Sequence, residues 1–126
     1  MQESGEDYLE TILLLKMRQG YVRAIDVANE MEYSKASISR AVKILKEQGL
    51  IYLDDNRMIN FTEVGRKKAE EIYHRHRLIT DYLHEVLGVS EDTAAKDACR
   101  IEHVISAETI EKITQAVEKK KFDKAE

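Results

Sequence analysis

The sequence predicts a mainly α-helical fold with one small β-hairpin, and three observations support this class. Proline is absent and glycine occurs only five times in 126 residues, a composition that favours helices over an all-β or disordered chain. Apolar residues recur at spacings of three and four along most of the chain, as they do in amphipathic helices. Two short apolar runs flank the turn-forming cluster Asp54-Asp55-Asn56-Arg57, which is typical of a hairpin.

Length and composition limit the class of protein further. A chain of this length forms one domain or two small subdomains, and we expect units over residues 1–63 and 64–126. No apolar run approaches the roughly 18 residues that span a bilayer, and the N-terminus lacks the features of a signal peptide. The sequence therefore predicts a cytoplasmic protein with no membrane partner, and its single cysteine, Cys99, cannot form an intrachain disulfide.

The first predicted helix covers residues 5–18, and Gln19-Gly20 directly after it is a normal helix end. Its apolar stripe contains Leu9, Ile12 and Leu13. On the polar face, Asp7 and Glu10 are three residues apart, so both carboxylates could bind one cation. The alternative is an acidic first turn that stabilises the helix dipole, and this segment alone leaves both interpretations open.

Two helices follow, over residues 24–31 and 34–48, joined by a tight turn at Glu32-Tyr33. Ser34 is a good N-cap for the second helix, because its hydroxyl can accept a hydrogen bond from a backbone N–H of the first turn. We expect the first of these helices to bury Ile25, Ala28 and Met31. We expect the second to bury Ile38, Ala41, Val42 and Leu45. Two helices in this arrangement, the second one basic, form a helix-turn-helix pattern.

The predicted hairpin comes directly after this motif, with strands over residues 50–53 and 58–61. A hairpin in this place corresponds to the wing of a winged helix, so the fold class becomes an N-terminal winged helix-turn-helix followed by a helical domain. Arg57, at the tip, lies either near a phosphate backbone or in a solvated turn.

Charge is unevenly distributed along the chain. The net charge is −4, which by itself argues against nucleic-acid binding. Between Tyr33 and Lys46, however, all the charged side chains are basic, whereas residues 3–10 carry only acidic ones. This segregation allows a basic face for phosphate and an acidic region for cations.

A long helix is predicted from Thr62 to about Leu87, and it has one unusual position. Its apolar stripe contains Ala69, Ile72, Ile79, Leu83 and Val86. His76 interrupts this stripe where packing would favour an apolar residue. A hydrogen-bonded core histidine and a metal ligand both remain possible.

The last third of the sequence contains two further helices, which Ser90 and Ser106 are expected to cap. In the first, Cys99, Glu102 and His103 stand at i, i+3 and i+4 and would share one helical face. A small buried thiol beside two surface residues is the alternative. The second has an apolar stripe of Ile110, Ile113 and Val117, and we expect residues 118–126 to fray into solvent.

Six candidate metal ligands therefore come from three helices. They are Asp7, Glu10, His76, Cys99, Glu102 and His103. This mixture of oxygen, nitrogen and sulfur donors suits a divalent first-row metal, because carboxylates favour Mn²⁺ or Fe²⁺ and a thiolate moves the preference toward Fe²⁺, Co²⁺ or Zn²⁺. A structural zinc site would usually contain two or more cysteines.

Four segments spread along nearly the whole chain are distinctive in combination. They are EDYLE at 6–10, FTEVG at 61–65, HRHRL at 74–78 and DACRIEHVIS at 97–106. In these segments the chain resembles the diphtheria toxin repressor and manganese transport regulator family of metal-dependent repressors, in its short form without an SH3-like domain. The resemblance implies a winged-helix DNA-binding domain, a helical dimerisation domain, and the six ligands above at their junction.

The sequence departs from that family at two places. The manganese branch usually has glutamate at the position of Cys99, and the iron branch has methionine at the position of Asp7, so this chain combines features of both. The ancillary site of the iron branch requires a glutamate and a histidine at positions occupied here by Thr80 and Ala95. The resemblance therefore implies Mn²⁺ or Fe²⁺, with Co²⁺ or Zn²⁺ as substitutes, and an absent or rebuilt second site.

The resemblance also implies a homodimer that binds double-stranded operator DNA. Base-edge contacts would fall near Ser34, Ala36 and Arg40, of which only Arg40 can read guanine bidentately. Phosphate contacts would come from Lys35, Ser37, Lys43 and Arg57.

Two other functions compete with a metal-dependent regulator. A winged-helix regulator could sense a small molecule or a thiol oxidant through Cys99, without metal. A small metalloenzyme could use the same ligands to activate water, although the sequence contains no hydrolase motif. We therefore expect a regulator and not an enzyme.

Overall fold

The computed structural model describes residues 3–125 of the chain. The chain divides between Glu71 and Ile72 into two compact units, called here the N-terminal unit and the C-terminal unit. The helix α4 (Glu63–Asp81) contains this division. No helix in the described part of the chain is both long and apolar enough to cross a membrane.

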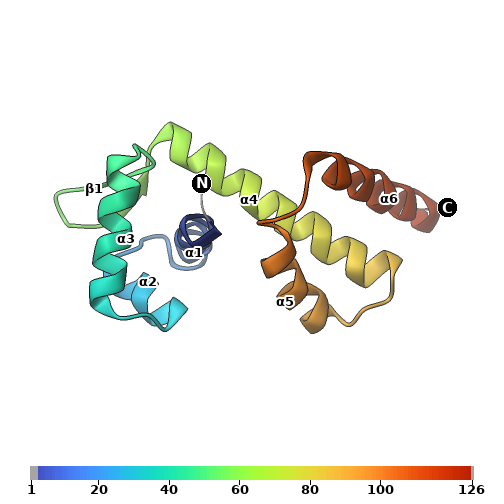
Figure 1. The fold of residues 1–126 in the computed structure, drawn as a ribbon, viewed down its shortest axis with the longest axis horizontal. Helices are drawn as coiled ribbons and strands as arrows, with labels where there is room; N and C mark the ends of the chain where they lie inside the picture. The colour runs from blue at the N-terminus through green and yellow to red at the C-terminus, as the bar shows by residue number, and fades with distance from the viewer. Residues whose placement is uncertain (1–2, 126) are drawn as a thin grey trace. The chain divides into compact units, whose positions relative to one another are not determined.

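The N-terminal unit contains three helices and a hairpin, as Figure 1 shows. The helices are α1 (Glu3–Gln19), α2 (Ala24–Met31) and α3 (Lys35–Glu47). The strands are β1 (Ile51–Leu53) and β2 (Ile59–Phe61). The unit folds around side chains that are at most 2% exposed, among them Leu9, Ile12, Ile38, Leu45, Ile51 and Ile59. The predicted winged helix-turn-helix is thus confirmed.

The turn between α2 and α3 has the predicted cap. Ser34 Oγ accepts a hydrogen bond from the Ser37 backbone N–H at 3.1 Å. Glu32 has a φ of 58°, a left-handed conformation that is costly for a residue with a Cβ. The surrounding packing must therefore hold this turn in place.

The predicted inward face of α2 was partly wrong. Ile25 is 42% exposed, whereas Val27 and Ala28 are buried. Ile25 and Val27 are two positions apart, about 200° of helical rotation, so α2 cannot bury both. The face of α3 was predicted correctly, because Ile38, Ala41, Val42 and Leu45 are all buried.

The hairpin is attached to the rest of its unit. The strands are antiparallel, with Ile51 opposite Phe61 and Leu53 opposite Ile59. The Ile59 N–H donates to the Val22 carbonyl oxygen at 2.7 Å. Lys16 Nζ of α1 donates to Asn60 Oδ1 at 2.9 Å, so the wing has contacts with α1 and with the segment before α2.

The start of α4 packs tightly against the end of the helix-turn-helix. Thr62 Oγ1 donates to the Gly49 carbonyl oxygen at 2.6 Å and accepts a hydrogen bond from the Gly65 N–H at 3.0 Å. A Cβ at Gly65 would overlap the Leu50 carbonyl oxygen. Only glycine fits at this position.

The C-terminal unit contains the rest of α4, the π-helical segment η1 (Tyr82–Val86), α5 (Glu91–Ile101) and α6 (Ala107–Ala125) (Figure 1). The sequence predicted an unbroken helix to Leu87. Instead η1 changes the helical phase, so the predicted stripe does not continue and Val86 is exposed. Ser90 and Ser106 cap α5 and α6 as predicted.

The prediction that the chain frays after Glu118 was wrong, because α6 continues to Ala125. Residues 118–123 are exposed, and Lys121 Nζ lies 4.0 Å from an Asp81 carboxylate oxygen. The lysine, glutamate and alanine residues that dominate this segment favour helix by intrinsic propensity.

Candidate metal centre and DNA-binding face

Two of the predicted ligands, Cys99 and Glu102, lie near a nitrogen of a third, His76 Nδ1, in the C-terminal unit. His76 is on α4, and its Nδ1 lies 2.9 Å from Glu102 Oε2. Cys99 Sγ, on α5, lies 3.9 Å from the same nitrogen. A carboxylate oxygen and a sulfur thus both lie near one imidazole nitrogen, and we call His76, Cys99 and Glu102 the His76 cluster.

The local geometry differs from the predicted helical face. α5 ends at Ile101, Glu102 is its C-cap, and His103 lies in the turn beyond it. The expected i, i+3, i+4 helical face is therefore interrupted at Glu102. The prediction of a buried thiol as the alternative role of Cys99 was wrong, because Cys99 is exposed.

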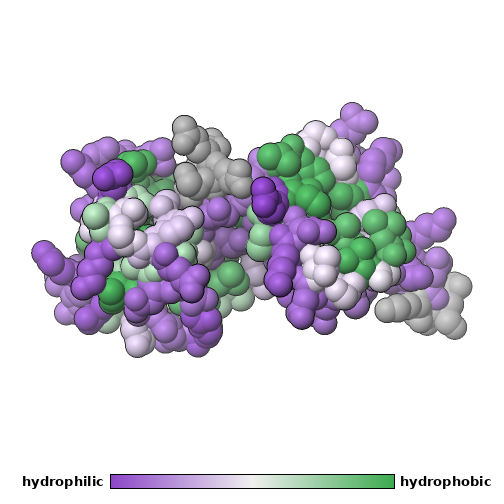
Figure 2. Space-filling view, turned by 60° about the horizontal axis from the view of Figure 1, so that its bottom comes forward, coloured by the Kyte–Doolittle hydropathy of each residue, from purple (hydrophilic) through white to green (hydrophobic). Residues whose placement is uncertain are grey.

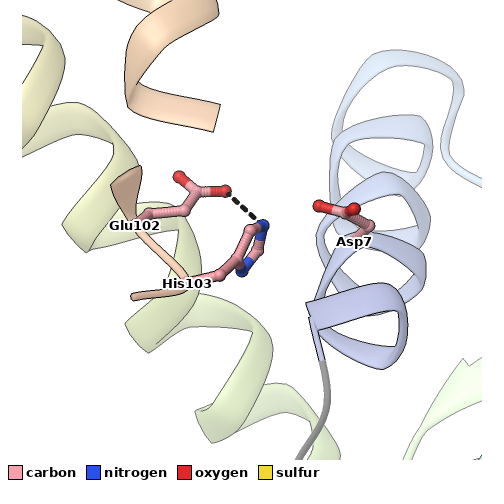
Figure 3. Close-up of side chains that lie close together, drawn as sticks. All are labelled: Asp7, Glu102 and His103. Carbon is pink, nitrogen blue, oxygen red and sulfur yellow. Dashed lines mark ion pairs between the residues drawn. The ribbon is translucent and has the colours of Figure 1, made fainter. Parts of the chain in front are cut away.

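Glu102 is the buried acid of this unit, with a side chain that is 0% exposed. Its Oε1 lies 3.4 Å from His103 Nε2, and Figure 3 shows this ion pair together with Asp7, the third residue drawn. The geometry is that of an ion pair without a hydrogen bond, and within the described part of the chain Oε1 has no hydrogen-bond partner. A buried carboxylate oxygen in this state can accept a cation.

The electrostatics of the His76 cluster also favour a positive charge. The hydrogen bonds that the imidazole makes to Cys99 and Glu102, opposed by burial, raise the pKa of His76 from 6.5 to about 10. The imidazole is therefore protonated at neutral pH, and its positive charge lies beside the Glu102 carboxylate. The donor set suits a divalent first-row metal in place of that proton.

The two remaining candidate ligands belong to the N-terminal unit. Asp7 and Glu10 are both on α1, three residues apart, and so on one helical face. Asp7 is half-buried and Glu10 is 8% exposed. Burial of an acid argues against the alternative of a purely solvated first turn, because a buried carboxylate requires compensation.

Thr80 is one of the two positions at which the resemblance implied an absent or rebuilt second site. Its hydroxyl donates to the His76 carbonyl oxygen at 2.7 Å, which is a bond within α4. The Thr80 hydroxyl therefore bonds to the backbone of α4, the helix that carries His76.

The basic face of the N-terminal unit is formed by α3 and the hairpin. The candidate DNA-binding residues on it are exposed, except that Ser37 is half-buried. These residues are Ser34, Lys35, Ala36, Ser37, Arg40, Lys43 and Arg57. Because these side chains are exposed, they are accessible to DNA.

A cavity of about 350 Å³ lies between α3 and the hairpin on this face. Lys43, Lys46 and Arg57 line it. Arg57 has a φ of 62°, and its N–H donates to the Asp54 carbonyl oxygen at 2.9 Å. Three cations around one cavity suit a phosphate group.

Sequence reasoning assigned no role to Lys46. Its spacing of three residues from Lys43 is the signal that would have placed both on one face of α3. The hairpin contribution to the same cavity could not be predicted from spacing.

Tyr8 of α1 lies beside the DNA-binding face. Its ring contacts the ring of Tyr33 edge-to-face, with centroids 6.1 Å apart and planes at 76°. Burial raises the pKa of Tyr8, Tyr33 and Asp7 act in the same direction, and the Arg40 guanidinium opposes them. Tyr8 is thus within electrostatic range of a ligand candidate and of a DNA-binding candidate.

A winged helix with a basic face, joined to a helical unit with a mixed-donor cluster, defines the class of metal-responsive DNA-binding regulators. The comparison with known families agrees with this class. Residues 1–57 match the family described as iron dependent repressor, N-terminal DNA binding domain. Residues 62–125 match the iron dependent repressor, metal binding and dimerisation domain.

Individual relatives show the same similarity. An uncharacterised HTH-type transcriptional regulator of Methanocaldococcus jannaschii is 32% identical over 120 residues, which cover 94% of this chain and 96% of the relative. The regulator MntR of Geobacillus kaustophilus is 34% identical over 116 residues, covering 91% and 81%. The chain belongs to the iron-dependent repressor family of metal-dependent transcriptional regulators.

A solved structure described as a manganese-dependent transcriptional repressor in complex with manganese has a similar fold. The TM-score is 0.81 at 28% identity, over 90% of this chain and 52% of that one. The chain thus spans about half the length of this structure.

Proposed function

We propose that this protein is a repressor that binds operator DNA as a homodimer when it is loaded with Mn²⁺ or Fe²⁺, and so controls metal uptake. The observation that carries the proposal is the His76 cluster. Glu102 Oε2 and Cys99 Sγ both lie near His76 Nδ1, and these residues belong to a unit that matches a metal-binding and dimerisation domain.

The proposed metal ligands are His76, Cys99, Glu102 and His103, completed by Asp7 and Glu10 of α1. The burial of Glu10 and Glu102 supports this set, because both acids need a counter-charge. A divalent cation supplies that charge when bound. The manganese named for the similar structure supports Mn²⁺, and the Cys99 thiolate supports Fe²⁺, Co²⁺ or Zn²⁺ as alternatives.

In the proposed complex α3 lies in the major groove. Ser34, Ala36 and Arg40 face base edges, and only Arg40 has the planar fork that reads guanine. Lys35 and Ser37 contact the backbone, while Lys43, Lys46 and Arg57 hold one phosphate at their cavity. Exposure of these residues and the match to a DNA-binding domain support the assignment.

Exposed apolar side chains support a dimer formed through the C-terminal unit. Leu87, Val104 and Phe122 are each more than half exposed, and Figure 2 shows apolar surface between hydrophilic residues. Two copies would present two recognition helices to a palindromic site. We also propose residues 1–63 and 64–126 as the functional domains, a cytoplasmic location where operator DNA is found, and no enzymatic activity.

The proposed coupling between metal binding and operator binding follows from ligands on both α1 and the C-terminal unit that bind one cation. In the proposal Asp7, Glu10 and Glu102 attach to one cation, whose charge would stabilise all three carboxylates. The ordered protein then binds operator more tightly, and operator raises the metal affinity by the same factor. We expect a coupling of about 1–3 kcal/mol.

The test is His103→Ala, with His74→Ala as a matched control because His74 is exposed on α4. The probe is a labelled duplex selected from random DNA by the Mn²⁺-loaded protein. We expect His103→Ala to lose Mn²⁺-dependent binding and keep its helical circular dichroism, whereas the control behaves like wild type. An undiminished Mn²⁺ response in His103→Ala would rule out the assignment.

The exposure of Cys99 favours one competing function, a regulator that responds to thiol oxidants without metal. A chelator distinguishes the two. DNA binding that is unchanged by chelator and lost on peroxide treatment, but retained by Cys99→Ser, would support the competing function.

A further inference from the structure

We propose that Tyr8 and Tyr33 are positioning residues that transmit metal binding on α1 to the turn before the recognition helix α3. The inference rests on the proposed function, because it takes Asp7 and Glu10 as metal ligands. It concerns contacts inside the N-terminal unit alone.

The first step is the position of Tyr8. It directly follows Asp7 and lies two residues before Glu10 on α1. Any change in the orientation of α1 that accompanies ligation by these two acids therefore moves the Tyr8 ring. A rigid helix transmits rotation about its axis along its full length.

The second step is the position of Tyr33. Its N–H donates to the Ala28 carbonyl oxygen at 3.0 Å, and it stands next to Ser34, the N-cap of α3. Half of its surface is exposed, so packing from α2 and α3 does not enclose the ring. The edge-to-face contact with Tyr8 is the ring contact found for it in the described part of the chain.

The third step is the conformation of the turn itself. Glu32 has a left-handed backbone, which persists only where neighbouring contacts impose it. Backbone bonds to the Ala28 carbonyl oxygen hold this turn as the C-cap of α2, and the ring pair adds a contact that joins the turn to α1. Loss of the ring pair therefore loosens the start of α3 with respect to α1.

The fourth step concerns what moves with the turn. Ser34, Lys35 and Ala36 form the first turn of α3 and its cap, and they are candidate DNA contacts. Arg40 is four residues after Ala36 and so on the same face of α3. The Tyr8–Tyr33 pair thus joins the metal-ligand helix to the DNA-contacting end of α3.

The first experiment needs no DNA. Zn²⁺ is added to the isotope-labelled protein as a diamagnetic probe, and the backbone amide shifts of Tyr33 and Ser34 are followed by NMR. We expect Zn²⁺ to shift both amides in wild type and in Tyr8→Phe, which keeps the ring. We expect most of this shift to be lost in Tyr8→Leu, although Zn²⁺ still binds.

The second experiment measures DNA affinity with and without Mn²⁺ on the selected duplex. Tyr8→Leu and Tyr33→Leu should each reduce the ratio of the two affinities about three- to tenfold, the range expected for loss of an aromatic pair. The metal-free affinity should fall less than the Mn²⁺-loaded affinity, so that the ratio decreases. The double variant should be no worse than either single variant, because both remove one interaction.

Tyr21→Leu is the matched control, since Tyr21 is 47% exposed in the same unit and should leave the ratio unchanged. If wild type responds to Mn²⁺ and both leucine variants respond equally, or if Tyr8→Leu keeps the full Zn²⁺ shift at Tyr33, the inference is wrong. If wild type itself shows no Mn²⁺ response, the proposed function fails instead.

Discussion

At the scale of single residues, the central feature is a buried acid within hydrogen-bond distance of a histidine. Glu102 Oε2 lies 2.9 Å from His76 Nδ1 in a side chain without exposure. A carboxylate removed from water is costly unless a positive charge accompanies it. In the metal-free protein that charge is the imidazolium of His76.

This contact predicts a pH dependence for the metal-free protein. The pKa of His76 is raised from 6.5 to about 10 by its bonds to Cys99 and Glu102. The resulting stabilisation is fully present below pH 6.5 and is lost as the pH rises toward 10. Thermal unfolding in chelator should show a steeper loss of stability over this range in wild type than in Glu102→Gln. Parallel profiles for the two proteins would contradict the prediction.

The sequence identified the residues of the cluster but not their local geometry. Spacing placed Cys99, Glu102 and His103 on one helix face, whereas α5 ends at Ile101. The reason is that a helix end without glycine or proline leaves little local signal, and tertiary contacts of Glu102 decide where the chain turns. The stripe that singled out His76 was a stronger signal, because it depends only on helical period.

At the scale of elements, the junction between the hairpin and α4 fixes the start of α4 against the segment that follows α3. Thr62 bonds to Gly49, and Gly65 lies directly against the Leu50 backbone. The sequence predicted the hairpin and the start of the long helix near Thr62 from local patterns. The close approach at Gly65 joins segments 15 residues apart, which no local pattern reveals.

This junction predicts that Gly65→Ala destabilises the protein by about 1–3 kcal/mol or more, because backbone atoms must shift to admit the new methyl group. Chemical denaturation measures the change. Val64→Ala is the control, since Val64 is exposed on the same turn and should change the free energy of unfolding by about 0.5 kcal/mol or less. Equal stability of the two variants would show that the junction can relax.

At the scale of the whole molecule, the two units differ in their cores. The described residues buried in the C-terminal unit include only three large apolar side chains, Ile72, Ile79 and Val117, with Ala94, Ala98 and the charged Glu102. A core of this size provides limited hydrophobic stabilisation. The unit is thus suited to gain stability from a ligand and a second copy, a property that composition alone did not predict.

The prediction at this scale is a metal-dependent stability. A metal that binds only the folded protein adds about 2.7 kcal/mol to the free energy of unfolding at 100 times its dissociation constant. Denaturation with and without Mn²⁺ should show this gain in wild type and its reversal by chelator. Glu102→Ala should show no gain, and His74→Ala should match wild type. A full gain in Glu102→Ala would remove Glu102 from the site.

One feature of the N-terminal unit bears on the choice of DNA target. Lys16, near one end of α1, holds Asn60 of the wing, and Tyr8, near the other, touches Tyr33 before α3. Helix α1 therefore contacts both the wing and the turn before the recognition helix. These two elements cannot adjust independently to DNA grooves of different width. Discrimination between operators should then depend on how readily each DNA sequence deforms to fit a fixed protein spacing.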